Sequence, residues 1–409
     1  MDTILFILSL CLKVFTLYFA LVAVFALKKR TRRPRTAPGL RFAVVAAARN
    51  EEAVIGNLVQ SVLDQDYPCE LRDVYVIPNN CTDRTEDAAL AAGARLIHCQ
   101  GRVSGKGDAL RQAFAQLTQK DYDAFVVLDA DNTLAPDYLA RMNDAFAAGA
   151  MVCKSRTKAA NPTASGVAGC YGLYNTCFDL IWNRPRAACG LSAKLIGTGF
   201  ALRREVLETL GGWNTSTIAE DAEFSSQCAQ AGFRVEWVPE AVNYDEEPTS
   251  FRVSLRQRRR WCSGIMQVAK RRAVPLWQAK CPNAMLRWDI TMFLLAPFAQ
   301  ALSGLLLLAG ILTGLGEALF TDAPVLASLL PIAIPAAVYL AGCTILAAAL
   351  CLLGGYGLRG MARTIVMFPI FMASWLPLEM VSLFKDTTTW QAVVHQGVRK
   401  GSETAVQTP

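Results

Sequence analysis

The stretch AFVVLDAD (Ala124–Asp131) is a run of apolar residues that ends directly in two aspartates. Three similar apolar runs precede it: RFAVVAAA (Arg41–Ala48), VYVI (Val74–Ile77) and ARLIH (Ala94–His98). Stretches with a helical pattern separate the runs: Ala53–Leu63, a segment from about Arg84, and Gly107–Leu117. Because strands that alternate with helices form parallel sheets covered on both faces, the sequence predicts an α/β, Rossmann-like domain with a doubly wound sheet.

Polar residues follow the predicted strands where each strand ends. They are Arg49–Glu52, Asn79–Asn80, and Asp129 with Asp131. Ligands of doubly wound sheets bind beyond the carboxyl ends of the strands, so we expect the site there. The two aspartates suit a divalent cation that bridges to a diphosphate, since Mg²⁺ or Mn²⁺ takes carboxylate and phosphate oxygens. The alternative is that these acids cap the next helix.

The general base is expected to be a carboxylate. The chain has only two histidines, and neither lies near a nucleophile motif, which excludes a Ser-His-Asp triad and a histidine-rich zinc site. Glu220 and Asp221 are the best candidates for a base that deprotonates a hydroxyl group. The alternative is that they cap the helix that runs to Ala231.

Two basic motifs suit phosphate groups. Gln257–Trp261 (QRRRW) places arginines, which contact phosphate in a bidentate manner, beside a tryptophan that suits a sugar or a base. The alternative is a basic patch next to a membrane. Lys106 stands between two glycines at the start of a helix, an arrangement that can hold a phosphate. Its spacing does not match a P-loop, which excludes a Walker-type nucleoside triphosphatase.

Hydrophobic residues make up 53% of the chain and concentrate at its start and after about Trp288. Four apolar stretches are candidates to span ~30 Å of hydrocarbon: Thr3–Leu27, Ile290–Leu315, Val325–Leu353 and Thr364–Phe384. The fourth contains two prolines, and it either spans or lies broken in the interface. The basic run Lys28–Arg35 places the end of the first span in the cytoplasm, with the N-terminus outside. We therefore expect a multi-pass protein of the cell membrane.

The predicted organisation has four parts: a membrane helix with its basic segment (1–35), the α/β domain (36–272), interfacial and membrane helices with two or three spans (273–385), and a tail (386–409). The 13 cysteines include no C-x-x-C pair, which indicates small buried side chains in a reducing compartment. The net charge of +7 concentrates in Lys28–Arg35 and Arg252–Arg272. Because both runs adjoin membrane segments, we interpret them as contacts with anionic lipid rather than with nucleic acid.

Four motifs, in this order, resemble the family-two inverting glycosyltransferases of the GT-A fold. They are N-E (Asn50–Glu51), D-x-D (Asp129–Asp131), E-D (Glu220–Asp221) and Q-x-x-R-W (Gln257–Trp261). The resemblance covers about residues 41–270 and is greatest to processive membrane enzymes, the hyaluronan, cellulose, chitin and poly-N-acetylglucosamine synthases. It implies a cytoplasmic GT-A domain between transmembrane segments, a UDP-sugar donor, and Mg²⁺ or Mn²⁺ as cofactor.

The resemblance also implies a role for each motif residue. Asp221 would be the general base with Glu220 beside it, and Asp131 with Asp129 would bind the metal. The residues expected to bind the nucleotide sugar are Asn50, Glu51, Asn79, Lys106, Asp129, Gln257, Arg260 and Trp261. Those expected to bind the acceptor are Gly197, Thr198, Gly199 and Trp261.

Three positions depart from the family pattern. Ala47 replaces the usual proline before N-E, which softens the turn. Asn79 replaces an aspartate that faces the base, so nucleotide preference is less constrained. Ala219 replaces a common threonine before E-D, and we expect activity to survive because the acid at Asp221 is retained.

The implied function is sugar transfer to a growing polysaccharide. The alternative is transfer of one sugar to a lipid or a short glycan, and a third reading is a sugar-nucleotide-binding scaffold without activity, against which the intact Asp131, Asp221 and Arg260 argue. Three or four spans are few for a channel, which favours a homo-oligomer or a small membrane partner. The tail segment Lys385–His395 resembles a motif near the catalytic face, which implies a cytoplasmic C-terminus and an interfacial Thr364–Phe384.

Overall fold

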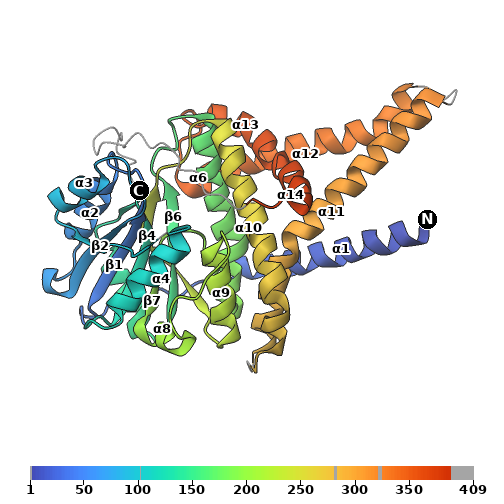
Figure 1. Cartoon of the computed structure of the whole chain (residues 1–409). Coiled ribbons are helices and arrows are strands. Elements are labelled where there is room, and N and C mark those ends of the chain that lie inside the picture. The colour runs from blue at the N-terminus through green and yellow to red at the C-terminus, as the bar shows by residue number, and fades with distance from the viewer. Residues whose placement is uncertain (1, 102, 281–282, 321–324, 388–409) are drawn as a thin grey trace.

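The structure is a computed structural model that describes residues 2–101, 103–280, 283–320 and 325–387 (Figure 1). It contains a sheet domain joined to a set of long apolar helices. Most of the predicted tail motif, including Trp390 and His395, lies outside the described residues.

The sheet has eight strands in the order β3-β2-β1-β4-β7-β6-β8-β5. Their bounds are β1 (Phe42–Ala48), β2 (Arg72–Pro78), β3 (Arg95–Leu96), β4 (Ala124–Asp129), β5 (Thr133–Leu134), β6 (Val152–Ala159), β7 (Phe200–Arg203) and β8 (Val235–Asp245). The four strands predicted from the sequence are β1 to β4, and they pair in parallel as expected.

The second half of the sheet departs from the parallel arrangement predicted for the strands up to residue 131. β7 runs antiparallel to both β4 and β6, so the sheet is mixed. The chain enters β7 at the carboxyl edge of β4, where the Gly199 N–H donates to the Val127 carbonyl at 3.0 Å. Gly197 and Gly199 allow this entry because their φ angles of 49° and 65° fall in the left-handed region. The reversal brings residues 197–199 to the predicted site.

Helices cover both faces of the sheet, and each face carries its own apolar core. The helices of this domain are α2 (Ile55–Leu63), α3 (Thr85–Ala91), α4 (Lys106–Leu117), α5 (Tyr138–Ala147), α6 (Gly166–Phe178), α7 (Arg184–Cys189), α8 (Arg204–Leu210), α9 (Glu220–Gln230) and α10 (Phe251–Gln278). Short helical segments occur at η1 (Phe25–Leu27) and η2 (Cys69–Leu71), and a π-helical turn, η3 (Asp179–Asn183), joins α6 to α7.

Five apolar helices form the remainder: α1 (Asp2–Val24), α11 (Ala284–Phe320), α12 (Val325–Gly354), α13 (Ala362–Ala373) and α14 (Trp375–Phe384). By length and composition, four segments could cross a membrane: Phe6–Leu27, Ala284–Gly316, Ile332–Gly354 and Ala362–Phe384. α1, α11 and α12 project away from the sheet domain (Figure 1). The fourth segment is broken at Ser374, and its halves pack against the domain, α13 on α6 and α14 on α10.

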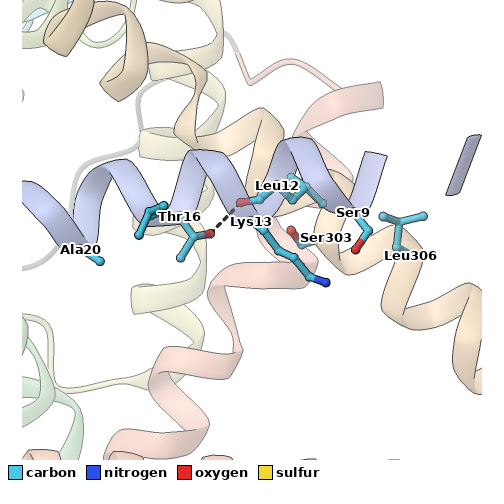
Figure 2. Close-up of a pocket in the computed structure, with 8 residues that line it drawn as sticks. Ser9, Leu12, Lys13, Thr16, Ala20, Ser303 and Leu306 are labelled. Carbon is cyan, nitrogen blue, oxygen red and sulfur yellow. Dashed lines mark hydrogen bonds between the residues drawn. The ribbon is translucent and has the colours of Figure 1, made fainter. Parts of the chain in front are cut away.

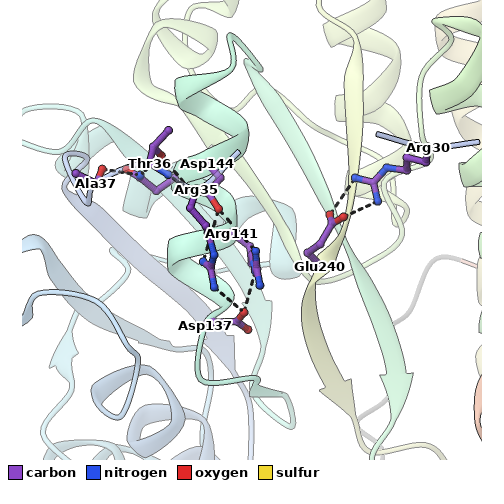
Figure 3. A network of polar contacts seen from close by, with 9 residues as sticks. Arg30, Arg35, Thr36, Ala37, Asp137, Arg141, Asp144 and Glu240 are labelled. Carbon is purple, nitrogen blue, oxygen red and sulfur yellow. Dashed lines mark hydrogen bonds and ion pairs between the residues drawn. The ribbon is translucent and has the colours of Figure 1, made fainter. Parts of the chain in front are cut away.

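The basic segment after α1 runs along the sheet domain and pairs with its acids (Figure 3). Arg30 makes two bonds of 2.9 Å to Glu240, at the middle of β8. Arg35 lies 3.6 Å from Asp144 and 3.4 Å from Asp137 on the α5 side. The sequence did not predict these ion pairs, and the contact of the basic run with anionic lipid stays a prediction.

Candidate active site

Lys106, at the start of α4, joins three of the predicted motifs. Its ammonium donates to Asp129 Oδ1 at 2.5 Å and to the Gly197 carbonyl at 2.6 Å, and lies 3.7 Å from Glu220 Oε1. Gly107 allows α4 to lie close to the segment before α9, because a Cβ there would lie 2.8 Å from Thr215 Oγ1 and 3.4 Å from Glu220 Cβ. The charges of Asp129 and Glu220 raise the pKa of Lys106 against the effect of burial.

Asp221 and Glu220 occupy the first turn of α9 but have different surroundings. Asp221 Oδ2 accepts the Gly197 N–H at 2.5 Å, and its Oδ1 accepts the Ala222 N–H at 2.8 Å, while the side chain stays half-buried. Glu220 is 8% exposed, and burial raises its pKa to about 7, although Lys106 and Arg260 oppose the shift. Asp221 is therefore the more accessible of the two carboxylates, whereas Glu220 faces the Lys106 ammonium.

A group of acids lies at the carboxyl ends of β4 and β8. Asp131 and Asp245 are both bridged by the Asn132 amide, which donates to them at 3.1 and 2.8 Å. Burial raises the pKa of Asp131 well above its usual range, and the charges of Asp129 and Glu51 add to the shift. Burial also raises the pKa of Asp245, helped by Asp131.

Sequence reasoning missed Asp245 and its neighbour Glu247, whose pKa is raised by burial and by the charge of Asp245. The pattern that could have found them is the one used for β4, since β8 also runs from apolar residues into a cluster of acids. β8 returns beside β5, which brings these acids next to Asp131.

These acids fit a divalent cation that takes most of its ligands from a substrate. Among the described residues, no three acidic, histidine or cysteine side chains are arranged as a ready-made metal site. The charge of Asp129 helps to raise the pKa values of Asp131 and Asp245, and a bound cation would neutralise this concentration of negative charge. Mg²⁺ is commonly held by one or two carboxylates together with phosphate oxygens.

The segment 197–199 is placed behind Asp129 rather than open to an acceptor. Thr198 is 4% exposed, and its hydroxyl accepts the Asp129 N–H at 2.9 Å and donates to Asn132 Oδ1 at 2.7 Å. A Cβ on Gly199 would lie 2.4 Å from Asn243 Oδ1. The predicted acceptor contacts of Thr198 and Gly199 are therefore not supported, because their polar groups and space are used within the domain; Gly197 alone is half-exposed.

The predicted nucleotide residues near β1 and β2 lie in the loops at the edge of the sheet. Asn50, with φ of 58°, accepts the Thr82 N–H at 2.8 Å, and Asn79 Oδ1 accepts from Asn80 at 2.8 Å. Glu51 is 8% exposed, and burial raises its pKa to about 8, with help from the charge of Asp129. The two asparagines thus hold loops, while Glu51 faces the acids.

The residues of the Q-x-x-R-W motif lie in two different surroundings. Arg260 interacts electrostatically with Glu220 on the catalytic side. Gln257 Oε1 accepts from the Tyr171 hydroxyl at 2.8 Å, and the Trp261 ring stacks on Trp375 at 6.2 Å. Both side chains contact α6 and α14, and their binding of the donor stays a prediction.

The sequence did not single out Arg258, which anchors this motif. It is fully buried, donates to the Phe371 carbonyl at 2.9 Å, and lies 4.0 Å from the centre of the Phe371 ring. It also lies 5.3 Å from the Trp375 ring. The segment Ala362–Phe384 is thereby fastened to the helix that carries the motif.

A separate groove of about 540 Å³ lies between α1 and α11, away from these residues (Figure 2). Its polar lining includes Ser9, Lys13 and Thr16 of α1 and Ser303 of α11. It does not belong to the candidate site, because no predicted site residue lines it.

Comparison with known proteins identifies the family. Residues 38–264 match the glycosyltransferase-like family 2. The chain belongs to this family. The match ends in α10, three residues after Trp261, and thus includes all four motifs.

Three curated relatives of this family-2 protein can be compared. The probable glycosyltransferase YdaM of Bacillus subtilis is 30% identical over 240 residues, which are 56% of each chain. The beta-monoglucosyldiacylglycerol synthase of Synechocystis is 30% identical over 275 residues, 64% of this chain and 55% of the relative. The N-acetylglucosaminyltransferase of Rhizobium leguminosarum is 28% identical over 236 residues, 53% of this chain and 54% of the relative. The chain thus spans about half the length of these relatives.

The family-2 domain has the GT-A fold. The mannosyltransferase PcManGT from Pyrobaculum calidifontis, solved with GDP-Man and Mn²⁺, covers 94% of this chain with 99% of its own length. The TM-score is 0.64 and the sequence identity 20%, so this likeness concerns the fold alone.

Proposed function

We propose that this family-2 glycosyltransferase transfers a sugar from a nucleoside diphosphate sugar, with UDP as the expected nucleotide, to an acceptor at the membrane surface. The proposal depends on one observation: the Gly197 backbone contacts both Lys106 and Asp221, for which we expect different roles. The Gly197 carbonyl accepts from Lys106, which pairs with Asp129, and the Gly197 N–H donates to Asp221. A cationic group for a leaving diphosphate thus lies next to a carboxylate that can act as a base.

The reaction follows from these positions. The acceptor hydroxyl oxygen bonds to the anomeric carbon as the bond to the diphosphate breaks, and its proton passes to Asp221. Lys106 and Arg260 stabilise the negative charge that the leaving group gains, and such electrostatic contributions are often the largest in catalysis. A divalent cation held by Asp131 and Asp129, with Asp245 close by, would add positive charge at the diphosphate. Attack from the face opposite the leaving group inverts the anomeric configuration.

The acceptor we favour is a lipid in the membrane. Three relatives at 27–30% identity are named beta-monoglucosyldiacylglycerol synthases. Arg258 and Trp261 of α10 contact α13 and α14, so the site's wall continues into the apolar helices. A growing polysaccharide is the second candidate, supported by 24% identity over 242 residues to a putative cellulose synthase of Komagataeibacter xylinus.

We also propose that the domain faces the cytoplasm, with three membrane spans formed by α1, α11 and α12. The interfacial placement of α13 and α14 is supported by their packing on α6 and α10 of the domain. A homo-oligomer or a small membrane partner remains a prediction from the sequence.

A donor screen with the full chain in lipid nanodiscs tests the activity. UDP-glucose, UDP-N-acetylglucosamine, UDP-glucuronate and GDP-mannose are each supplied in labelled form with Mg²⁺ or Mn²⁺. Label in an organic extract would identify a lipid product, and label in a high-molecular-mass fraction a polysaccharide. Absence of transfer from every donor, with diacylglycerol and oligosaccharide acceptors present, would contradict the proposal.

The role of Asp221 is tested by Asp221→Asn. The amide keeps the shape but cannot accept the proton, so transfer should fall by about 100- to 10,000-fold. Nucleotide affinity, measured by calorimetry, should stay unchanged because Asp221 lies on the far side of Gly197 from Lys106. Near-normal turnover of this variant would refute the assignment.

A further inference from the structure

Asn132 is a fully buried asparagine between β4 and β5, and its side chain uses every hydrogen bond that it can make. Its Nδ2 donates to Asp131 Oδ1 at 3.1 Å and to Asp245 Oδ1 at 2.8 Å. Its Oδ1 accepts from the Thr198 hydroxyl at 2.7 Å and from the Asn243 amide at 2.8 Å. Because an amide offers two hydrogens and two lone pairs, both hydrogens of Asn132 are committed to acids at the proposed cation site.

A buried chain of hydrogen bonds connects Asn132 to the Lys154 ammonium. Lys154 is 2% exposed and donates to the Thr157 hydroxyl, on the same strand β6, at 2.8 Å. Thr157 lies opposite Asn243 in the pairing of β6 with β8, and its hydroxyl donates to Asn243 Oδ1 at 3.1 Å. Because an ammonium can only donate, the Thr157 hydroxyl accepts from Lys154 and gives its own hydrogen to Asn243. Lys154 therefore fixes the direction of the buried chain.

The direction of the buried chain determines how both asparagine amides are turned. Asn243 Oδ1 also lies 2.7 Å from the Ser155 hydroxyl, so its oxygen faces β6 and its nitrogen faces Asn132. The Asn132 oxygen then faces Asn243, which leaves its nitrogen for the two acids. The opposite orientation would turn a carbonyl oxygen toward two carboxylates. Since hydrogen bonds in series polarise one another in a buried environment, the charge of Lys154 strengthens the donors that reach these acids.

We propose that Asn132 is a positioning residue for the divalent cation, because its amide holds the Asp131 and Asp245 carboxylates at a fixed separation before the cation binds. Lys154 orients this amide through the buried chain. Residues that hydrogen-bond to carboxylate ligands fix the orientation of those ligands, and losing one costs about 10- to 100-fold in metal affinity. The inference rests on the proposed role of Asp131 in holding the cation, and it adds the residues that place this carboxylate.

The test is Mn²⁺ binding to the full chain in lipid nanodiscs, with UDP present and, in a parallel series, with GDP. Electron paramagnetic resonance of free Mn²⁺ gives the dissociation constant without turnover. Asn132→Ala should weaken Mn²⁺ binding by about 10- to 100-fold, because the two carboxylates lose their shared donor. Asn143→Ala is the matched control, since Asn143 of α5 is also buried and bonds to residues 36–39 and to Tyr67. It should lower the melting temperature without changing the Mn²⁺ dissociation constant.

A second pair of variants tests the remote end of the buried chain, and it also decides the matter if Asn132→Ala does not fold. Thr157→Val keeps the shape of the side chain but removes the hydroxyl that links Lys154 to Asn243. Mn²⁺ affinity should fall by about tenfold, since Asn132 and both acids remain but the amides lose their imposed orientation. Thr157→Ser keeps the hydroxyl and should bind Mn²⁺ as the wild type does.

Steady-state transfer separates positioning of the cation from a general structural defect. At saturating Mn²⁺ the weakened variants should recover most of the wild-type kcat, while the Mn²⁺ concentration for half-maximal rate rises with the dissociation constant. A wild-type dissociation constant in Asn132→Ala, or in Thr157→Val where the first variant does not fold, would overturn the inference while leaving the transferase intact. A wild-type constant in Thr157→Val alone would overturn the role of Lys154. Failure of the proposed metal-assisted transfer would appear separately, as undiminished wild-type transfer in the presence of a chelator.

Discussion

Glu51 is a buried acid with one carboxyl oxygen that lacks a hydrogen-bond partner. Its Oε2 atom has no hydrogen-bond partner among the described residues, and only 8% of the residue is exposed. Its pKa of about 8, against an ordinary 4.5, arises first from burial and then from the charges of Asp129, Asp83 and Glu246. Folding therefore favours the protonated acid.

The sign of the pH effect follows from linkage. Between pH 4.5 and 8 the folded state holds a proton that the unfolded state releases, so this group costs stability increasingly as pH rises. Glu51→Gln should stabilise the protein at pH 8.5 by on the order of 2 kcal/mol and have little effect at pH 4.5. Thermal unfolding in detergent at both pH values measures this, with the exposed Glu208→Gln as control. Equal melting shifts at the two pH values would contradict the prediction.

The sequence predicted those site residues that are recognisable from their neighbours in the chain. Lys106, Asp129 and Asp221 stand in motifs next to strand or helix ends, and the structure brings them within one network. Asp245 and Arg258 were missed because their importance depends on partners far along the chain. Asp245 acquires its role from β8 returning beside β5, and Arg258 from its contact with Phe371.

Among the elements, α10 lies close to the start of α9 at Gly264. A Cβ at this position would lie 2.8 Å from the Ala219 Cβ and 3.3 Å from the Ala219 nitrogen. Ala219 immediately precedes α9, whose first residues are Glu220 and Asp221. The alanine at position 219, a departure from the family pattern, therefore lies against the smallest possible residue on α10.

Gly264→Ala should lower transfer by about tenfold or more, since a misplacement near 1 Å can cost about 100-fold. The substitution favours a helix by about 1 kcal/mol through propensity alone, so a loss cannot come from a weakened helix. Gly56→Ala in α2 is the control, because a Cβ there meets nothing within 4 Å. Steady-state transfer by the two variants makes the comparison, and equal activity would show that the Ala219 contact is unimportant.

The elements in the first half of the sheet could be predicted from the sequence, whereas the direction of β7 in the second half could not. The helices and strands up to β4 follow from alternating patterns, and the structure confirms them to within two residues, the short β3 included. β7 could not be predicted as antiparallel, because its direction depends on the turn at Gly197 and Gly199 and on pairing with β4. The GT-A resemblance implied the fold of the domain, whereas the alternating pattern indicated only its first four, parallel strands.

In the whole molecule, one buried ion pair joins the domain to two apolar helices. Arg186 of α7 makes two bonds of 2.9 Å to Asp289 of α11, with side chains 1% and 2% exposed. The Tyr18 hydroxyl of α1 donates to the same carboxylate at 2.7 Å. The guanidinium also lies 3.5 Å from the centre of the Trp182 ring. α1, α7 and α11 therefore share one polar junction.

Arg186→Ala should destabilise the protein by about 3–5 kcal/mol, because it leaves Asp289 buried without its partner. The double variant Arg186→Met with Asp289→Leu should recover much of this loss, since no charge then remains buried. Arg111→Ala, which breaks the exposed pair with Asp108, should cost at most about 1 kcal/mol. Thermal unfolding in detergent ranks the three variants, and a small effect of Arg186→Ala would indicate that the junction opens to water.

The path of the chain after α14 bears on the membrane topology. The Thr387 N–H donates to Ser263 Oγ at 2.8 Å, and its carbonyl accepts from Gln267 at 3.0 Å, so residue 387 lies on α10 of the catalytic domain. Asp386 also lies 3.6 Å from Lys270. A chain that leaves the domain in α11, returns in α12 and touches α10 again after α14 is best accounted for if Ala362–Phe384 does not cross the bilayer.

Epitope tags at the two ends test this topology in intact cells. With three spans, a tag at the N-terminus should be open to external protease, and a tag at the C-terminus should be cleaved only after permeabilisation. With four spans, Ala362–Phe384 would cross and both tags would be cleaved from outside. The second result would separate residue 387 from α10 by the width of the bilayer, which the hydrogen bonds to Ser263 and Gln267 do not allow.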